Sequence, residues 1–206
     1  MFLKKIPVTL FLILIVQTSY ADQIIKVGSP DGAVQLGLIH QADGSLFYSV
    51  TYKGRAVIAP SILGMKLKKP EFSLEKFDLL HIDSSVHDDT WKPVWGEVSS
   101  IRDHYRQLVL KLSDLSGSGI QLEIIFRVFN EGVGFRYSFP QQPKLNHFII
   151  ADELTQFAMT GDHKVFWIPG DYDTNEYSYY TTKLSGIPIT VFSLQNNGQN
   201  LNRNSE

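Results

Sequence analysis

The chain has 206 residues, a length that fits one domain of ordinary size or one domain with a tail. Lysine and arginine number 19 against 21 aspartates and glutamates, so the chain lacks the basic excess typical of proteins that bind nucleic acid. Cysteine is absent, which excludes a disulfide framework and a lipid-modified cysteine, so the domain depends on its hydrophobic core.

The first 21 residues have the pattern of a secretory signal peptide. Lys4 and Lys5 form a basic start, residues 6–16 are almost wholly apolar, and Ser19 and Ala21 are small residues at the positions a signal peptidase reads. We expect cleavage after Ala21 and a periplasmic or secreted protein without a stable membrane anchor, because the apolar run is too short to span a bilayer. The alternative is an uncleaved N-terminal anchor.

Short apolar runs separated by turns follow from residue 22 onwards. Turn residues at 43–44 and 53–54 bound a run whose alternation predicts a strand. One face of this strand carries Leu46, Tyr48, Val50 and Tyr52.

Residues 106–140 continue this strand periodicity. Two strands meet at the turn formed by residues 116–119, and a third strand follows up to Pro140. The apolar faces of the last two strands are Ile120, Leu122, Ile124, Phe126 and Val128, and then Val133, Phe135, Tyr137 and Phe139. Only residues 73–80 have a helical spacing, over a single turn. The periodicity therefore predicts an all-β, antiparallel β-sandwich.

Two stretches carry side chains capable of chemistry. In residues 81–89, "HIDSSVHDD" is either a charged, solvated loop between strands or a site for zinc or another divalent ion, although its spacing matches no recognised metal motif. In residues 91–105, Trp91 and Trp95 could stack on sugar rings, and Glu97 could act as an acid or base. The alternatives are core packing for at least one tryptophan, and an ion pair between a buried acid such as Glu97 and Arg102 or Arg136.

An ordered series of motifs resembles the N-terminal domain of glycoside hydrolase family 97, over about residues 24–190. The motifs are "SPDG" (29–32), "LFYSVTYKGRAVIAPSILGMKL" (46–67), "WGEVSSIRDHY" (95–105), "FRVFNEGVGFRYSFP" (126–140), "ELTQF" (153–157) and "DYDTNEYSYYTTKLS" (171–185). The resemblance implies an antiparallel β-super-sandwich of the galactose-mutarotase-like type. It also implies an exported bacterial α-glucosidase or α-galactosidase, acting on α-linked glucosides or galactosides.

In that family a (β/α)₈ barrel follows the sandwich and carries the catalytic carboxylates. The resemblance therefore implies that this chain is a domain without its barrel, inactive alone, and incomplete at its C-terminal end. We expect residues 1–21 to be the signal peptide, residues 22–192 the sandwich domain, and residues 193–206 a disordered polar tail. The alternative function is a stand-alone carbohydrate-binding module, whose stacking platforms would be Trp91, Trp95, Trp167 and the tyrosines at 172, 177, 179 and 180.

The resemblance also implies one metal ligand. The family's glutamate in the last motif coordinates calcium together with glutamates of the barrel, and Glu176 falls on that position. The sequence departs from the family at Asn175, where tyrosine is usual, and at Lys183, where proline is usual. Calcium takes six to eight oxygen ligands, so we expect the chain alone to bind no calcium at useful affinity.

Overall fold

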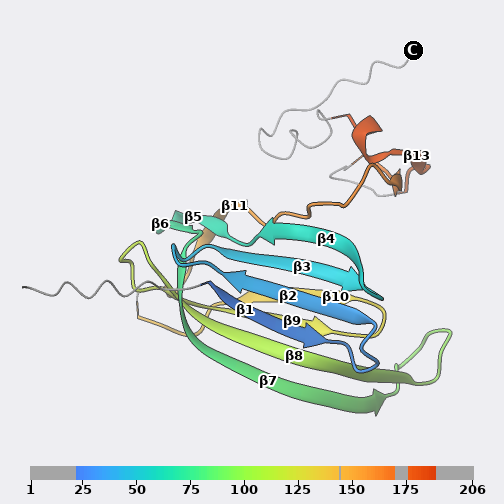
Figure 1. Cartoon of the computed structure of the whole chain (residues 1–206), viewed down its shortest axis with the longest axis horizontal. Helices are drawn as coiled ribbons and strands as arrows, with labels where there is room; N and C mark the ends of the chain where they lie inside the picture. The colour runs from blue at the N-terminus through green and yellow to red at the C-terminus, as the bar shows by residue number, and fades with distance from the viewer. Residues whose placement is uncertain (1–21, 144, 170–175, 189–206) are drawn as a thin grey trace, which may run out of the picture.

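The computed structural model describes residues 22–143, 145–169 and 176–188, and nearly all of its regular structure is β-strand. The first sheet is an antiparallel meander in the order β1-β2-β3-β4 (Figure 1). Its strands are β1 (Gln23–Gly28), β2 (Val34–His40), β3 (Leu46–Tyr52) and β4 (Arg55–Ile62).

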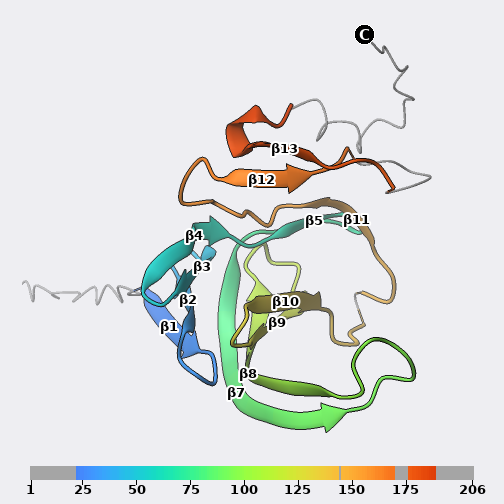
Figure 2. The ribbon, with the colours of Figure 1, turned by 90° about the vertical axis from the view of Figure 1, so that its right-hand side faces the viewer.

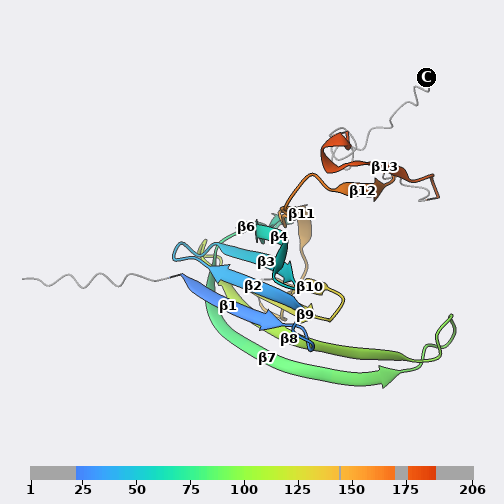
Figure 3. The ribbon, with the colours of Figure 1, turned by 45° about the vertical axis from the view of Figure 1, so that its right-hand side comes forward.

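The second sheet has the order β10-β9-β8-β7, and all its neighbouring strands are antiparallel. Its strands are β7 (Phe77–Trp91), β8 (Ile101–Asp114), β9 (Gln121–Val128) and β10 (Val133–Ser138). Strands β7 and β8 are much longer than the others and form a hairpin that continues past the end of the first sheet (Figures 1 and 3).

Two smaller sheets complete the regular structure of the described residues. The first has the order β11-β5-β6, and the second pairs β12 with β13, followed by the short 3₁₀ helix η1. These elements are β5 (Met65–Lys69), β6 (Glu71–Leu74), β11 (Ile149–Glu153), β12 (Lys164–Trp167), β13 (Tyr180–Lys183) and η1 (Leu184–Gly186). In the views of Figures 1 and 2, the β12–β13 hairpin projects from the body of the molecule on the side of β4.

The core lies between the two four-stranded sheets, because each strand turns alternate side chains towards the facing sheet. On β9, the inward residues Leu122, Ile124, Phe126 and Val128 are 0–1% exposed, while the residues between them are not buried. The first sheet contributes Val34, Leu36, Leu38, Leu46 and Tyr48 to the same cluster. The sandwich predicted from the sequence is thus confirmed, with the predicted strand faces of residues 46–52 and 120–139 turned to the core, except for Tyr52, which is 45% exposed at the end of its strand.

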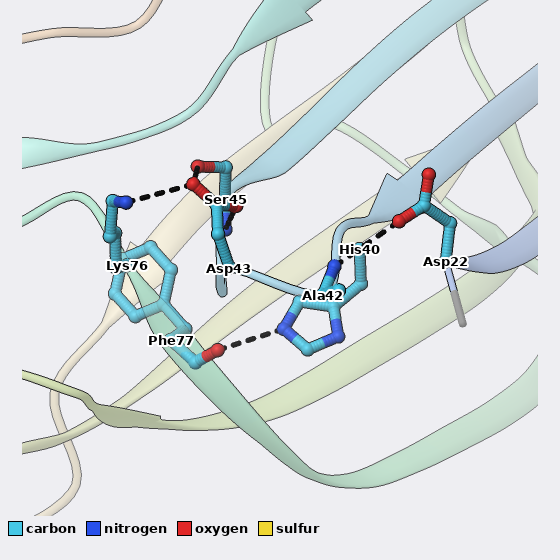
Figure 4. Close-up of polar contacts among 7 residues, drawn as sticks. All are labelled: Asp22, His40, Ala42, Asp43, Ser45, Lys76 and Phe77. Atoms are coloured by element: carbon cyan, nitrogen blue, oxygen red, sulfur yellow. Dashed lines mark hydrogen bonds and ion pairs between the residues drawn. The ribbon is translucent and has the colours of Figure 1, made fainter. Parts of the chain in front are cut away.

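A polar network ties the turn between β2 and β3 to the start of β7 (Figure 4). The Phe77 carbonyl lies 2.8 Å from Nε2 of His40, and the Phe77 amide donates to the Gly44 carbonyl at 2.8 Å. Gly44 has φ of +87°, and a Cβ there would lie 3.0 Å from the Phe77 oxygen, so the turn requires glycine. Nearby, Nζ of Lys76 donates to Asp43 at 2.8 Å.

The structure gives residues 73–80 no helix, in keeping with their weak helical spacing, and it contradicts the loop expected at residues 81–89. Residues 73–80 form no helix, because residues 71–74 pair with β5 and residues from Phe77 onwards pair with β8, and this pairing outweighs one turn of helical spacing. Residues 81–89 are not a loop: they lie within β7, paired with β8 throughout. Their side chains are largely solvated, as expected, because β7 is the edge strand of its sheet.

The expected signal peptide (residues 1–21) and the expected polar tail (193–206) lie outside the described residues. Within the described part of the chain, no helix has the length and apolar character needed to cross a membrane.

Candidate functional site

Glu176 lies on the projecting β12–β13 hairpin, four residues before β13 begins, and it is exposed. Strands β12 and β13 pair antiparallel, with Trp167 opposite Tyr180 and Lys164 opposite Lys183. The end of the hairpin that carries Glu176 therefore lies beyond the Trp167–Tyr180 pair. Residues 170–175, which contain the departure at Asn175, lie outside the described residues.

Local contacts hold this hairpin together. The Trp167 indole stacks on the Tyr180 ring at a centroid distance of 4.9 Å, and its Nε1 donates to Oγ1 of Thr182 at 3.0 Å. At the other end, the Asp162 carboxylate accepts hydrogen bonds from the backbone N (2.8 Å) and Oγ (2.9 Å) of Ser185. These two hydrogen bonds lower the pKa of Asp162, because they stabilise its charged form.

A segment along the free edge of β4 attaches the hairpin to the sandwich. The Gln156 amide donates to the Ile62 carbonyl at 3.0 Å, and the Ala59 amide donates to the Ala158 carbonyl at 2.8 Å. The Tyr48 hydroxyl, which belongs to the core strand β3, donates to the Gln156 carbonyl at 2.7 Å. Burial of Tyr48 and the nearby Tyr137 raise its pKa to about 12, so this hydroxyl keeps its proton at neutral pH.

The hairpin and its attachment expose several large apolar side chains, which we call the hairpin patch. Its members are Phe157 (57% exposed), Met159 (45%), Phe166 (65%), Tyr177 (39%), Tyr179 (72%), Tyr180 (54%) and Leu184 (37%). Scattered exposed apolar residues are ordinary, but seven within 28 residues of chain are a local concentration of apolar side chains.

Glu176 is the position that the family resemblance assigns to a calcium ligand. No group of three or more histidine, aspartate or glutamate side chains within them is placed to hold a metal ion. Glu176 can supply one carboxylate, whereas calcium takes six to eight oxygen ligands.

The polar side chains of residues 81–89 form pairs across the β7–β8 hairpin. Lys111 on β8 contacts Asp83 at 3.0 Å, His81 on the same strand as Asp83 contacts it at 2.8 Å, and these contacts, chiefly that of Lys111, lower the pKa of the Asp83 carboxyl. Arg102 makes a bidentate contact with Asp88, with both N–O distances at 2.7 Å. The alternative that paired Arg102 with a buried Glu97 is therefore excluded, because Glu97 is exposed and Arg102 contacts Asp88 on the neighbouring strand.

The three tryptophans have different environments. Trp91 and Trp95 are 51% and 88% exposed, so neither packs in the core. Trp167 is half-buried, and one face of its ring stacks on Tyr180. Trp91 and Trp95 thus remain open stacking surfaces, and Trp167 does not.

One group was missed from the sequence: Asp89 and Asp103 face each other across the β7–β8 hairpin, beside Trp91. No pattern in the sequence marks these two carboxylates as neighbours, because only the register of β7 with β8 brings them together.

The domain is thus a two-layer antiparallel β-sandwich that carries an exposed glutamate on a projecting hairpin. The model of the glycosyl-hydrolase 97 N-terminal family matches residues 27–198. The chain belongs to this family.

Known proteins resemble the chain over most of its length. A retaining α-galactosidase of Bacteroides thetaiotaomicron is 25% identical over 197 residues, which are 90% of this chain and 28% of that protein. A glycoside hydrolase family 97 enzyme of Pseudoalteromonas sp. strain K8, solved in complex with panose and with acarbose, is 30% identical, with a TM-score of 0.70 over 77% of this chain and 24% of that one. A β-arabinopyranosidase is 26% identical, with a TM-score of 0.62. The chain spans about a quarter of the length of these relatives.

Proposed function

We propose that this chain is the carbohydrate-facing N-terminal domain of an exported α-glycosidase of the glucosidase or galactosidase type. Family membership over residues 27–198 carries the proposal. It is supported by the relatives, which are a retaining α-galactosidase and an enzyme solved with panose and with acarbose.

The domain itself has no hydrolytic activity in this proposal. Most glycosidases act through two carboxyl groups that flank the scissile bond, and the resemblance assigns these groups to the barrel. The purified mature chain should release no nitrophenol from nitrophenyl α-glucoside or α-galactoside above a blank. Release that scales with the concentration of the chain would overturn this part of the proposal.

The role of the β12–β13 hairpin is to bring Glu176 to the catalytic barrel. The hairpin patch supports this role, because a covered apolar surface around Glu176 would fix the position of the carboxylate. In the complete enzyme Glu176 supplies one carboxylate to a calcium ion, and the barrel supplies the other ligands. The chain alone should bind no calcium at useful affinity.

A chimeric enzyme tests this role. In it, residues 22–198 of this chain replace the N-terminal domain of the Pseudoalteromonas enzyme, and activity is followed as calcium is added. Glu176→Gln should raise the calcium concentration needed for half-maximal activity at least tenfold, because it removes a charged ligand. Glu131→Gln, at an exposed turn outside the hairpin, is the matched control and should change nothing. An unchanged calcium requirement in the Glu176 variant would exclude Glu176 as a ligand.

Export is proposed from the N-terminal pattern. Expression in a Gram-negative host should give a periplasmic or secreted protein whose first residue is Asp22, as N-terminal sequencing would show. A cell-bound product that retains residues 1–21 would instead favour the uncleaved anchor.

A further inference from the structure

The β7–β8 hairpin continues past the sandwich as a two-stranded arm, which we define as residues 86–106. The core ends at Leu108, which is 4% exposed, and strand β9 ends opposite Arg106. Beyond this point the pairing of β7 with β8 runs without a register shift from Val86↔Arg106 to Trp91↔Ile101. The arm is therefore a regular ladder that holds its side chains at fixed spacings (Figure 3).

Alternation divides the arm into two faces. The inner face, continuous with the core, carries Asp88 and Arg102, and their bidentate pair satisfies both charges. The outer face carries Trp91, Asp89 and His87 on β7, directly opposite Ile101, Asp103 and Tyr105 on β8. Along β7 this outer stripe spans about 14 Å from Trp91 to His87, at about 3.4 Å per residue.

The inner end of the stripe is rigid. The His87 ring stacks on Tyr105 at a centroid distance of 4.8 Å. Tyr105 is 6% exposed and is backed by Phe129 at 5.1 Å and by the Arg127 guanidinium at 4.4 Å from its ring. The His87 side chain remains 42% exposed, so a fixed imidazole faces solvent.

The middle of the stripe has two carboxylates opposite each other, which is an unfavourable arrangement for stability alone. Oδ2 of Asp103 lies 3.6 Å from Nε2 of His87, too far for a good hydrogen bond, and Oδ1 of Asp89 accepts from the adjacent Thr90 amide. Each carboxylate can accept several hydrogen bonds, so the pair offers acceptors to a ligand rich in donors.

We propose that this outer stripe binds a neutral oligosaccharide. The exposed face of Trp91 stacks on a sugar ring, and Asp89 and Asp103 accept hydrogen bonds from its hydroxyls. His87 bonds a further hydroxyl. A sugar suits this surface for two reasons. Its hydroxyl groups are uncharged hydrogen-bond donors for the carboxylates, and its ring presents an apolar face to the indole. The choice of a carbohydrate as the ligand rests on the proposed function. The site itself is new and lies far from Glu176 in the sequence.

A calorimetric titration of the purified mature chain with panose tests the site. We expect saturable binding with a dissociation constant on the order of 1 mM, because an open surface buries little of the ligand. Trp91→Ala and Asp103→Asn should each weaken binding at least fivefold. Trp167→Phe and Asp152→Asn, on other parts of the surface, should leave it unchanged.

Three outcomes would overturn the inference. The first is no saturation by panose, maltotetraose or melibiose up to about 20 mM, well above the expected dissociation constant. The second is binding that survives both Trp91→Ala and Asp103→Asn. The third is evidence that the stripe serves another ligand while no sugar binds. Calcium binding that is lost in Asp103→Asn, or self-association that is lost in Trp91→Ala, would be such evidence. The chimera tests Glu176 separately, so failure here leaves the proposed function standing.

Discussion

The sandwich body and the projecting β12–β13 hairpin are stabilised in different ways. In the body, alternate residues of β9 are 0–1% exposed, and the two sheets bury them together. In the hairpin, no residue of β12 or β13 is buried, and the Trp167–Tyr180 stack is one of the contacts that join the two strands. The fold therefore depends on the core of the body, whereas Glu176, the proposed calcium ligand, lies on a hairpin whose strands bury no residue.

The largest expected effect is in the body, at Phe126. Its side chain is fully buried, and its ring centroid lies 5.4 Å from that of Phe135. Phe126→Ala removes this packing and leaves a cavity, so the free energy of unfolding should fall by about 3–5 kcal/mol in urea titrations.

The matched substitution in the hairpin is Phe166→Ala, where the ring is 65% exposed. Unfolding free energy should change by less than about 0.5 kcal/mol there. Similar losses at Phe126 and Phe166 would break the distinction between the two regions.

The same difference explains how far the sequence could be interpreted. Where a strand has one buried and one solvated face, as in residues 120–128, apolar and polar residues alternate in the sequence, and the predicted strand is confirmed. Residues 81–89 are an edge strand with both faces largely solvated, so they carry no alternation and the loop prediction was wrong. The pairing of Arg102 with Asp88 depends on the register of β7 with β8, which composition does not reveal.

The candidate site was predictable only in part. Glu176 came from a family resemblance, because an exposed glutamate beside tyrosines has no periodicity that marks it. Trp91 and Trp95 are exposed because the β7–β8 hairpin extends beyond the first sheet. That extension depends on how the two sheets pack, and the local sequence does not reveal it.

An intermediate effect is expected at the joint between body and hairpin. The Tyr137 hydroxyl accepts from the Gly64 amide at 3.1 Å and shares a hydrogen bond with Oγ1 of Thr155 at 2.7 Å. Tyr137→Phe leaves these groups without that partner, so unfolding free energy should fall by about 1–2 kcal/mol. Tyr179→Phe, on the hairpin with 72% exposure, is the control and should have no measurable effect. Equal effects of the two variants would show that Tyr137 does not couple the regions.

A smaller and local effect is expected at Trp167. Trp167→Ala removes the stack on Tyr180 and the hydrogen bond to Thr182, but no core contact. The midpoint of urea unfolding should stay almost unchanged, while trypsin cleavage after Lys183 becomes several-fold faster because the hairpin opens more often. Phe166→Ala keeps the stack and should keep the original cleavage rate. A global loss of stability in Trp167→Ala would mean that the hairpin and the body unfold as one unit.

The smallest effect is expected at the exposed Asp43–Lys76 pair of the body (Figure 4). The hydrogen bond from Lys76, followed by those from Ser45, lowers the pKa of Asp43 to about 2 in the folded chain, below the usual aspartate value of 3.8. Because the folded pKa is the lower one, the stabilisation by this carboxylate is present above about pH 4 and is lost as the pH falls towards 2. Asp43→Asn should therefore lower the urea midpoint slightly at pH 5 and hardly at all at pH 2. A difference between the two proteins that persists undiminished at pH 2 would assign the effect to the neutral hydrogen bonds of the turn, and not to the charge of Asp43.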